Sequence, residues 1–153
     1  MFNRPFLIAQ ISDLHLSVRA QVRTLDKSGV HGDDAGGLPP MFFLKPTPLT
    51  QPSPGIIALA DAATGEGAAL ERLHRLANAV RDKVDYVSDT THAETSAAEA
   101  FAAGTGVCQD HAQVLIAAAR HLGYPARYVS GYLLPMEEGF PAASHAWAEL
   151  FVD

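Results

Sequence analysis

Cys108 and His145 are the two residues whose types and surroundings suit them for joint chemistry. Cys108 lies two positions after Gly106 and begins a segment with helical spacing, so we expect it in the first turn of a helix. The unpaired N–H groups and partial positive charge of a helix N-terminus favour a thiolate over a thiol and can hold an oxyanion. A cysteine in such a place is suited to nucleophilic attack on a carbonyl carbon.

His145 is the candidate base, and it opens the last predicted strand, 37 residues after Cys108 (145 minus 108). A strand beside the helix N-terminus would place its imidazole against the thiol. A third group should orient the imidazole. Glu149 lies roughly 13 Å farther along the same strand, at about 3.3 Å per residue, and Asp153 lies on the opposite face of that strand. From these residues alone, a buried cysteine and an unrelated surface histidine remain the simpler interpretation.

Three neighbours of this pair are candidates for lining a substrate cleft. Gln109 either lines the cleft or packs in the core. His111 follows Cys108 by about one helical turn, and helix geometry directs its side chain along the wall of the cleft. Trp147 shares a strand face with His145 and serves equally well as a cleft wall or as a core aromatic residue.

The elements that must position these residues are predicted mainly from residue 56 onward. Apolar residues at helical spacing predict an amphipathic helix over about 67–85. Ser96 and Glu99 have the form of a capping box, which opens a short helix ending near Gly104. A longer helix then carries Cys108 and ends at Gly123.

Strands are predicted on both sides of this helical part. The segments 127–134 and 144–152 show strand composition or alternation and follow the last helix. Near the N-terminus, 6–11 is typical of a buried strand, and 22–25 and 41–44 are typical of short strands. Tyr residues in 127–134 alternate on one face and are expected in the core.

Composition limits the class of protein. The chain has 153 residues, 48% hydrophobic and 18% charged, with a net charge of -6 and one cysteine. These values favour one soluble globular domain and exclude an intrachain disulfide. The sequence has no basic cluster of the kind that would indicate a nucleic-acid partner. It also has no apolar stretch long enough to cross a membrane and no signal-peptide cleavage pattern. We therefore expect a cytoplasmic protein.

Three motifs in order resemble the bacterial transglutaminase-like family, whose members are also described as predicted cysteine proteases. They are GVCQDHA at 106–112, GYPARYVSGY at 123–132 and SHAWAE at 144–149. The resemblance extends over roughly 22–153, and residues 47–50 resemble the family's linker between an N-terminal β-domain and the catalytic core. It implies an α+β fold with a papain-type core, in which helices pack on an antiparallel sheet.

The same resemblance implies a chemistry. Cys108 corresponds to the nucleophile and His145 to the base of an enzyme that acts on amide or peptide bonds through a thioester. It implies a protein or peptide substrate, and neither a metal nor a cofactor. The family's third member, an Asp, follows a Gly-Trp turn on the next strand, whereas this chain stops at Asp153. We therefore expect an incomplete sheet and an impaired triad.

The N-terminal residues carry a second resemblance. The segment ISDLHL at 11–16 resembles the first strand of calcineurin-like metallophosphoesterases, where a D-x-H motif, here Asp13 and His15, supplies two metal ligands. A two-metal site needs several further ligands, and no further motif of that family follows.

The expected organisation has three parts. Residues 1–16 are a phosphoesterase-like fragment, 17–55 are the tail of a β-domain and a linker, and 56–153 are a truncated transglutaminase-like core. Three functions stay open on this basis: a thiol hydrolase or transferase, a fragment of a metal-dependent phosphoesterase, and a non-catalytic remnant or interaction module.

Overall fold

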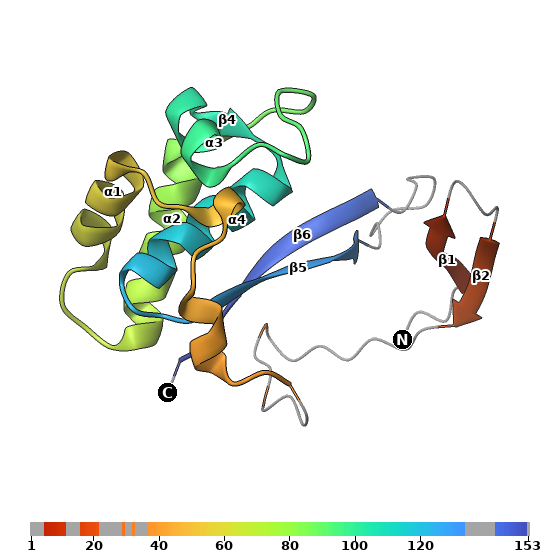
Figure 1. The fold of residues 1–153 in the computed structure, drawn as a ribbon, viewed down its shortest axis with the longest axis horizontal. Helices are drawn as coiled ribbons and strands as arrows, with labels where there is room; N and C mark the ends of the chain where they lie inside the picture. Colours follow the sequence, from red (N-terminus) through yellow and green to blue (C-terminus); the bar gives the residue numbers. More distant parts are fainter. Residues whose placement is uncertain are drawn as a thin grey trace. The chain divides into compact units, whose positions relative to one another are not determined.

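The structure is a computed structural model that describes residues 5–11, 16–21, 29, 32, 37–133 and 143–152. The chain forms two compact units (Figure 1). One comprises Met1–Gly37 and Tyr132–Ala143, and the other, here called the core unit, comprises Leu38–Gly131 and Ser144–Asp153. Both Cys108 and His145 belong to the core unit.

Helices make up most of the described part of the core unit. They are α1 (Pro54–Thr64), α2 (Ala69–Lys83), α3 (Ala97–Ala103) and α4 (Cys108–His121) (Figure 1). The central helix is α4, which contacts the other three and has 8 buried residues among its 14. Small side chains such as Ala117, Ala118 and Ala119 are fully buried in it and allow its neighbours to approach closely. Cys108 therefore stands at the end of the most enclosed helix of the fold.

Three of these helices follow the sequence prediction. The amphipathic segment forms α2, and the capping box opens α3, where Glu99 N–H donates to Ser96 Oγ (3.3 Å) and Ser96 N–H donates to Glu99 Oε2 (2.8 Å). After α4 ends, Gly123 takes a left-handed φ of 84°, as a helix-terminating glycine does. The sequence analysis did not predict α1, although Ser53 caps it and Pro54 begins it.

Strands β5 (Ala126–Leu133) and β6 (Ala143–Leu150) form a hydrogen-bonded two-stranded sheet, as predicted. They run in opposite directions (Figure 1). Phe151 N–H donates to Pro125 O (2.9 Å), so the end of β6 adjoins the start of β5. Ala126, Ala148 and Leu150 pack on the helical core. The fold is thus α+β, with helices packed on the antiparallel pair of β5 and β6.

A short parallel pair joins two connecting segments near α4. It consists of β3 (Asp85–Tyr86), which follows α2, and β4 (Thr105–Gly106), which precedes α4. Asp85 N–H donates to Gly104 O (2.8 Å) and Val87 N–H to Gly106 O (2.9 Å). This pairing brings Tyr86 to the N-terminal end of α4.

The strand predicted at 41–44 is wrong, because this segment forms the 3-10 helix η1 (Pro40–Leu44). Proline fixes φ near the helical value, and Phe42 N–H donates to Pro39 O (2.9 Å) to close the first turn. Phe43 stacks on Phe151 with ring centroids 5.5 Å apart. The aromatic residues of this segment therefore pack from a helical turn.

Arg120 connects three elements of the core unit. Its Nη1 donates to Thr50 Oγ1 (2.8 Å) in the 3-10 helix η2 (Pro48–Thr50), and its Nη2 donates to Ala126 O (2.8 Å) at the start of β5. Since Arg120 lies in the last turn of α4, this side chain fixes where the sheet begins relative to that helix.

The other unit contains the antiparallel strands β1 (Pro5–Ile11) and β2 (Leu16–Gln21), and β1 confirms the strand predicted at 6–11. Their register is irregular between Leu7 and Ala9. The strand predicted at 22–25, together with Asp13 and His15, lies outside the described residues. The organisation into 1–16, 17–55 and 56–153 stays a prediction.

The capping box of α3 leads to a prediction about pH. Hydrogen bonds from Ser96 lower the pKa of the Glu99 carboxyl below its ordinary value of 4.5. A carboxyl whose pKa is lower in the folded chain than its ordinary pKa stabilises the fold at pH values above the ordinary pKa. This stabilisation is lost as the pH falls through the folded-state pKa. We expect Ser96→Ala to lower the urea midpoint at about pH 7, and to do so by less at about pH 3, where a larger fraction of Glu99 is protonated.

The matched control for this comparison is Ser88→Ala, at an exposed position in a turn. It should leave the urea midpoint nearly unchanged at both pH values. A loss from Ser96→Ala that is equal at both pH values would show that the Glu99 carboxylate contributes nothing to the cap.

Candidate functional site

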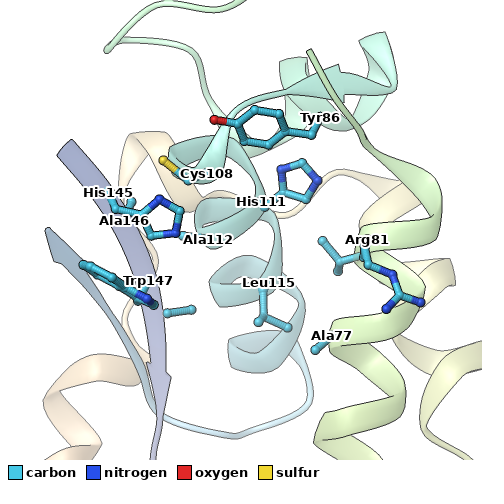
Figure 2. A pocket seen from close by; sticks show the side chains of 12 residues that line it. Ala77, Arg81, Tyr86, Cys108, His111, Ala112, Leu115, His145, Ala146 and Trp147 are labelled. Carbon is cyan, nitrogen blue, oxygen red and sulfur yellow. The ribbon is translucent and has the colours of Figure 1, made fainter. Parts of the chain in front are cut away.

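Cys108 and His145 line the same pocket, which has a volume of about 380 Å³ (Figure 2). Its walls are one face of α2, Tyr86 of β3, the first two turns of α4 and the middle of β6. The structure thus brings together Cys108, His145, His111 and Trp147 from the candidates named by sequence analysis. Gln109 is placed differently, because its Nε2 donates to His92 O (3.1 Å) and the residue does not line this pocket.

Cys108 is the first residue of α4, and its side chain is a free, half-buried thiol. The preceding residue, Val107, has extended backbone (φ -112°) and forms the N-cap. The free N–H groups of the first turn therefore begin at the cysteine itself. Figure 2 shows the Cys108 sulfur and the His145 imidazole at the same end of the pocket.

The start of α4 is held by the carboxylate of Asp110, which is fully buried. Asp110 Oδ2 accepts hydrogen bonds from Val107 N–H (2.7 Å) and from Thr91 Oγ1–H (2.6 Å). Asp110 is the third residue of the helix and reaches back to the N–H of the N-cap residue, as the acidic member of a capping box does, whereas valine has no side-chain oxygen for the other half of the box. Asp110 is therefore more than a first-turn carboxylate, because it also links α4 to the loop that contains Thr91.

Gly106 is the residue that leaves room for this carboxylate. A Cβ atom at position 106 would stand 2.6 Å from Asp110 Cβ and 2.9 Å from Asp110 Cγ. Real side chains do not approach so closely, so any other residue at 106 would displace Asp110. The glycine two positions before Cys108 is therefore required by close packing.

His111 is held by the backbone on both sides of its ring. Nδ1 lies 3.0 Å from Val107 O, and Nε2 lies 2.8 Å from Val84 O at the end of α2. Since both ring nitrogens face carbonyl oxygens, neither is directed at the Cys108 thiol. The Tyr86 ring stacks against His111 at a centroid distance of 6.2 Å. His111 therefore forms a wall of the pocket and joins α4 to α2.

On the opposite wall, His145 and Trp147 stand next to each other on β6. Their ring centroids are 4.7 Å apart in an edge-to-face arrangement. Trp147 is 39% exposed, so it is a wall of the pocket more than a core residue. Gly131 of β5 lies beneath it, where a Cβ would be 3.2 Å from Trp147 Cζ3. The glycine therefore leaves room for the edge of the indole ring.

Glu149 is committed to another partner. Its Oε2 accepts a hydrogen bond from Arg127 Nε (2.5 Å), and the Arg127 guanidinium also lies over the rings of Phe43 and Phe151. Glu149 is thus part of a structural cluster at the far end of β6 from His145.

Tyr128 and Tyr132 were expected in the core, but they are 41% and 46% exposed. They lie on β5, where strand alternation directs one set of side chains away from the helices. Partial burial raises the pKa of Tyr128, and electrostatic interaction with Cys108 and Asp110 raises it further. Tyr128 is therefore a neutral phenol near the start of α4, a position that strand periodicity alone does not reveal.

Within the described ranges, no group of three or more His, Cys, Asp or Glu side chains is arranged to hold a metal ion. Of the helices in the described part of the chain, none combines the length and apolar character needed to span a bilayer.

Comparison with known proteins places this site in a family. Residues 57–153 match the model of the transglutaminase-like superfamily. A solved structure from Cytophaga hutchinsonii, described as a "Putative Cysteine Protease", is similar with a TM-score of 0.61 and 31% identity, covering 72% of this chain and 37% of that one.

Mycobacterial sequences are also similar. Uncharacterized protein ML0607 of Mycobacterium leprae is 32% identical over 69% of this chain and 40% of its own length. Uncharacterized protein Rv2569c of Mycobacterium tuberculosis is 38% identical over 54% of this chain and 28% of its own length. The chain thus spans less than half the length of these curated relatives.

The buried carboxylate of Asp110 leads to a prediction about the stability of the fold. Asp110→Ala should lower the free energy of unfolding by about 1–3 kcal/mol, because it leaves the Val107 N–H and the Thr91 hydroxyl without their acceptor. Thr91→Val, which removes one donor, should cost less. Urea unfolding followed by circular dichroism measures both changes.

Asp82→Ala is the control, since this carboxylate forms an exposed ion pair with Arg81. Its effect should stay within about 0.5 kcal/mol. If Asp110→Ala proved as mild as Asp82→Ala, the helix start would not depend on the buried carboxylate.

Proposed function

Since this chain belongs to the transglutaminase-like superfamily, we propose that it carries the Cys–His pair of an enzyme acting on amide bonds in proteins or peptides. One observation carries the proposal: Cys108 begins α4, and His145 of β6 lines the same pocket. The similar Cytophaga structure, described as a "Putative Cysteine Protease", supports the same kind of chemistry.

In the proposed reaction, His145 takes the proton from Cys108 as the sulfur attacks the carbonyl carbon of the amide. A C–S bond forms, and the carbonyl oxygen becomes an oxyanion beside the N-terminus of α4, where free N–H groups can donate to it. Collapse of this intermediate breaks the C–N bond, and His145 returns the proton to the departing amine. The product on the enzyme is a thioester.

The second half of the reaction releases the acyl group. Water or an amine loses a proton to His145 and attacks the thioester carbonyl, and the Cys108 thiol is regenerated with that proton. Water gives hydrolysis and an amine gives transamidation, through the same intermediate. The open side of the pocket is where either one enters.

Orientation of His145 is part of the proposal. The edge-to-face contact with Trp147 at 4.7 Å restricts the ring, while Glu149 is held by Arg127. The third triad member expected from the family resemblance is not among the described residues, so the proposal rests on the Cys–His pair.

Alkylation of the thiol tests the proposal. A free thiol is only a few per cent thiolate at pH 7, so activation by α4 and His145 should make Cys108 react with iodoacetamide about tenfold faster than glutathione, or more. His145→Ala should remove most of this advantage. Labelling is measured by mass spectrometry at Cys108, which is the only cysteine of the chain.

His74→Ala serves as the matched histidine control, because His74 is exposed on α2 and does not line the pocket. It should leave the labelling rate unchanged, and Cys108→Ala should abolish any amide turnover. A wild-type rate no higher than that of glutathione would overturn the proposed pair.

A further inference from the structure

The pocket continues beyond the atoms that the proposed reaction needs. From Cys108 it runs between α2 and α4 over a floor of aliphatic side chains, namely Ala77, Val80, Ala112 and Leu115. Figure 2 shows Leu115 and Ala77 at the end of the pocket away from the Cys108 sulfur. The reaction of a thiol and an imidazole does not require this extension. The extension therefore has room for a part of the substrate next to the reacting carbonyl.

The walls above this floor favour an apolar occupant. Tyr86 is 64% exposed and Trp147 is 39% exposed, and both present ring surface to the pocket. Arg81 has the one fixed charge among the described residues of the lining, and its guanidinium is engaged by Asp82 at 2.9 Å. An acidic group in the pocket would compete with that carboxylate, whereas an apolar side chain would bury against the floor.

The size of the pocket fits a side chain. Its volume of about 380 Å³ lies at the low end of the range of about 300–1,000 Å³ for ligand pockets. That space suits one or two side chains of an extended peptide. It does not suit a folded domain.

We propose, building on the function proposed above, that this apolar pocket binds the side chain of the substrate residue that flanks the attacked amide carbonyl. It selects medium-sized and large apolar side chains, such as those of leucine and phenylalanine, over glycine and over acidic residues. Ala77 and Leu115 are the residues that set this specificity.

N-acetyl aminoacyl chloromethyl ketones of glycine, leucine, phenylalanine and aspartate test the inference. In each, the Cys108 thiolate displaces chloride at the methylene carbon, so a C–S bond forms and a C–Cl bond breaks. Second-order rates are divided by the iodoacetamide rate of the same protein, which removes differences in thiol reactivity. We expect the leucine and phenylalanine reagents to react about tenfold faster than those of glycine and aspartate, or more.

Larger side chains at position 77 test the same inference by filling part of the pocket. Ala77→Ile and Ala77→Phe should reduce the preference progressively, when each ketone rate is divided by the iodoacetamide rate of the same variant. Asn78→Phe is the matched control, because position 78 follows on α2 but is exposed and outside the lining. The milder Ala77→Ile keeps the test usable if Ala77→Phe fails to fold.

The outcomes separate the two proposals. Fast iodoacetamide labelling with equal rates for all four ketones overturns the pocket inference and leaves the Cys–His pair standing. A preference that Ala77→Ile and Ala77→Phe leave unchanged also overturns it. Slow labelling by iodoacetamide overturns the proposed function and this inference with it.

Discussion

The hydrogen bonds accepted by the buried Asp110 carboxylate are the interaction on which the site depends most. They fix Val107 as the N-cap, and so they decide which residue is first in α4 and where its thiol stands. A carboxylate without exposed surface is costly unless it is hydrogen-bonded. Both hydrogen bonds are accepted by Asp110 Oδ2, and the buried Oδ1 has no hydrogen-bond partner among the described residues. Here the second donor, Thr91, comes from a loop 19 residues earlier in the chain, so the helix start and that loop are fixed together.

Rigidity around the pocket comes from links between elements as well as from the core. Arg120 ties the last turn of α4 to η2 and to the first residue of β5. His111 ties the first turn of α4 to the end of α2. One end of the central helix is thus attached to the sheet and the other to α2, which forms a wall of the pocket. The short, buried alanine side chains of α4 let the neighbouring elements pack at close range.

Much of the core could be predicted because its signals are local. Helical periodicity, a capping box and strand alternation identify α2, α3, β5 and β6, and the glycine before Cys108 marks the start of α4. The errors arise where local and tertiary effects compete. The apolar run at 41–44 is compatible with a strand, but Pro39 and Pro40 favour a helical turn. Helix α1 was missed because its apolar and small residues show little helical periodicity.

The site was predictable to a similar degree. Cys108 and His145 could be named from residue type and from family resemblance, since both lie in motifs. Tyr86 could not, because it reaches the pocket through the two-residue pairing of β3 with β4, which has no periodic signature. Gln109 was assigned to the cleft from its position beside the cysteine, yet its side chain turns to the backbone of His92. Position in the sequence near a reactive residue therefore says little about which way a side chain on a helix points.

The tight contact between Gly106 and Asp110 has a consequence for how this sequence can change. The two positions form one thermodynamic unit, so the effect of a substitution at one depends on the residue at the other, and the two effects do not add. Since Asp110 Cβ is the atom nearest to a Cβ at 106, at 2.6 Å, a side chain at 106 becomes compatible with the fold only after 110 has become glycine, and that earlier change removes the cap of α4. Any series of single substitutions at these two positions therefore includes a destabilised protein. The residues just before and after Cys108 can consequently change in few ways.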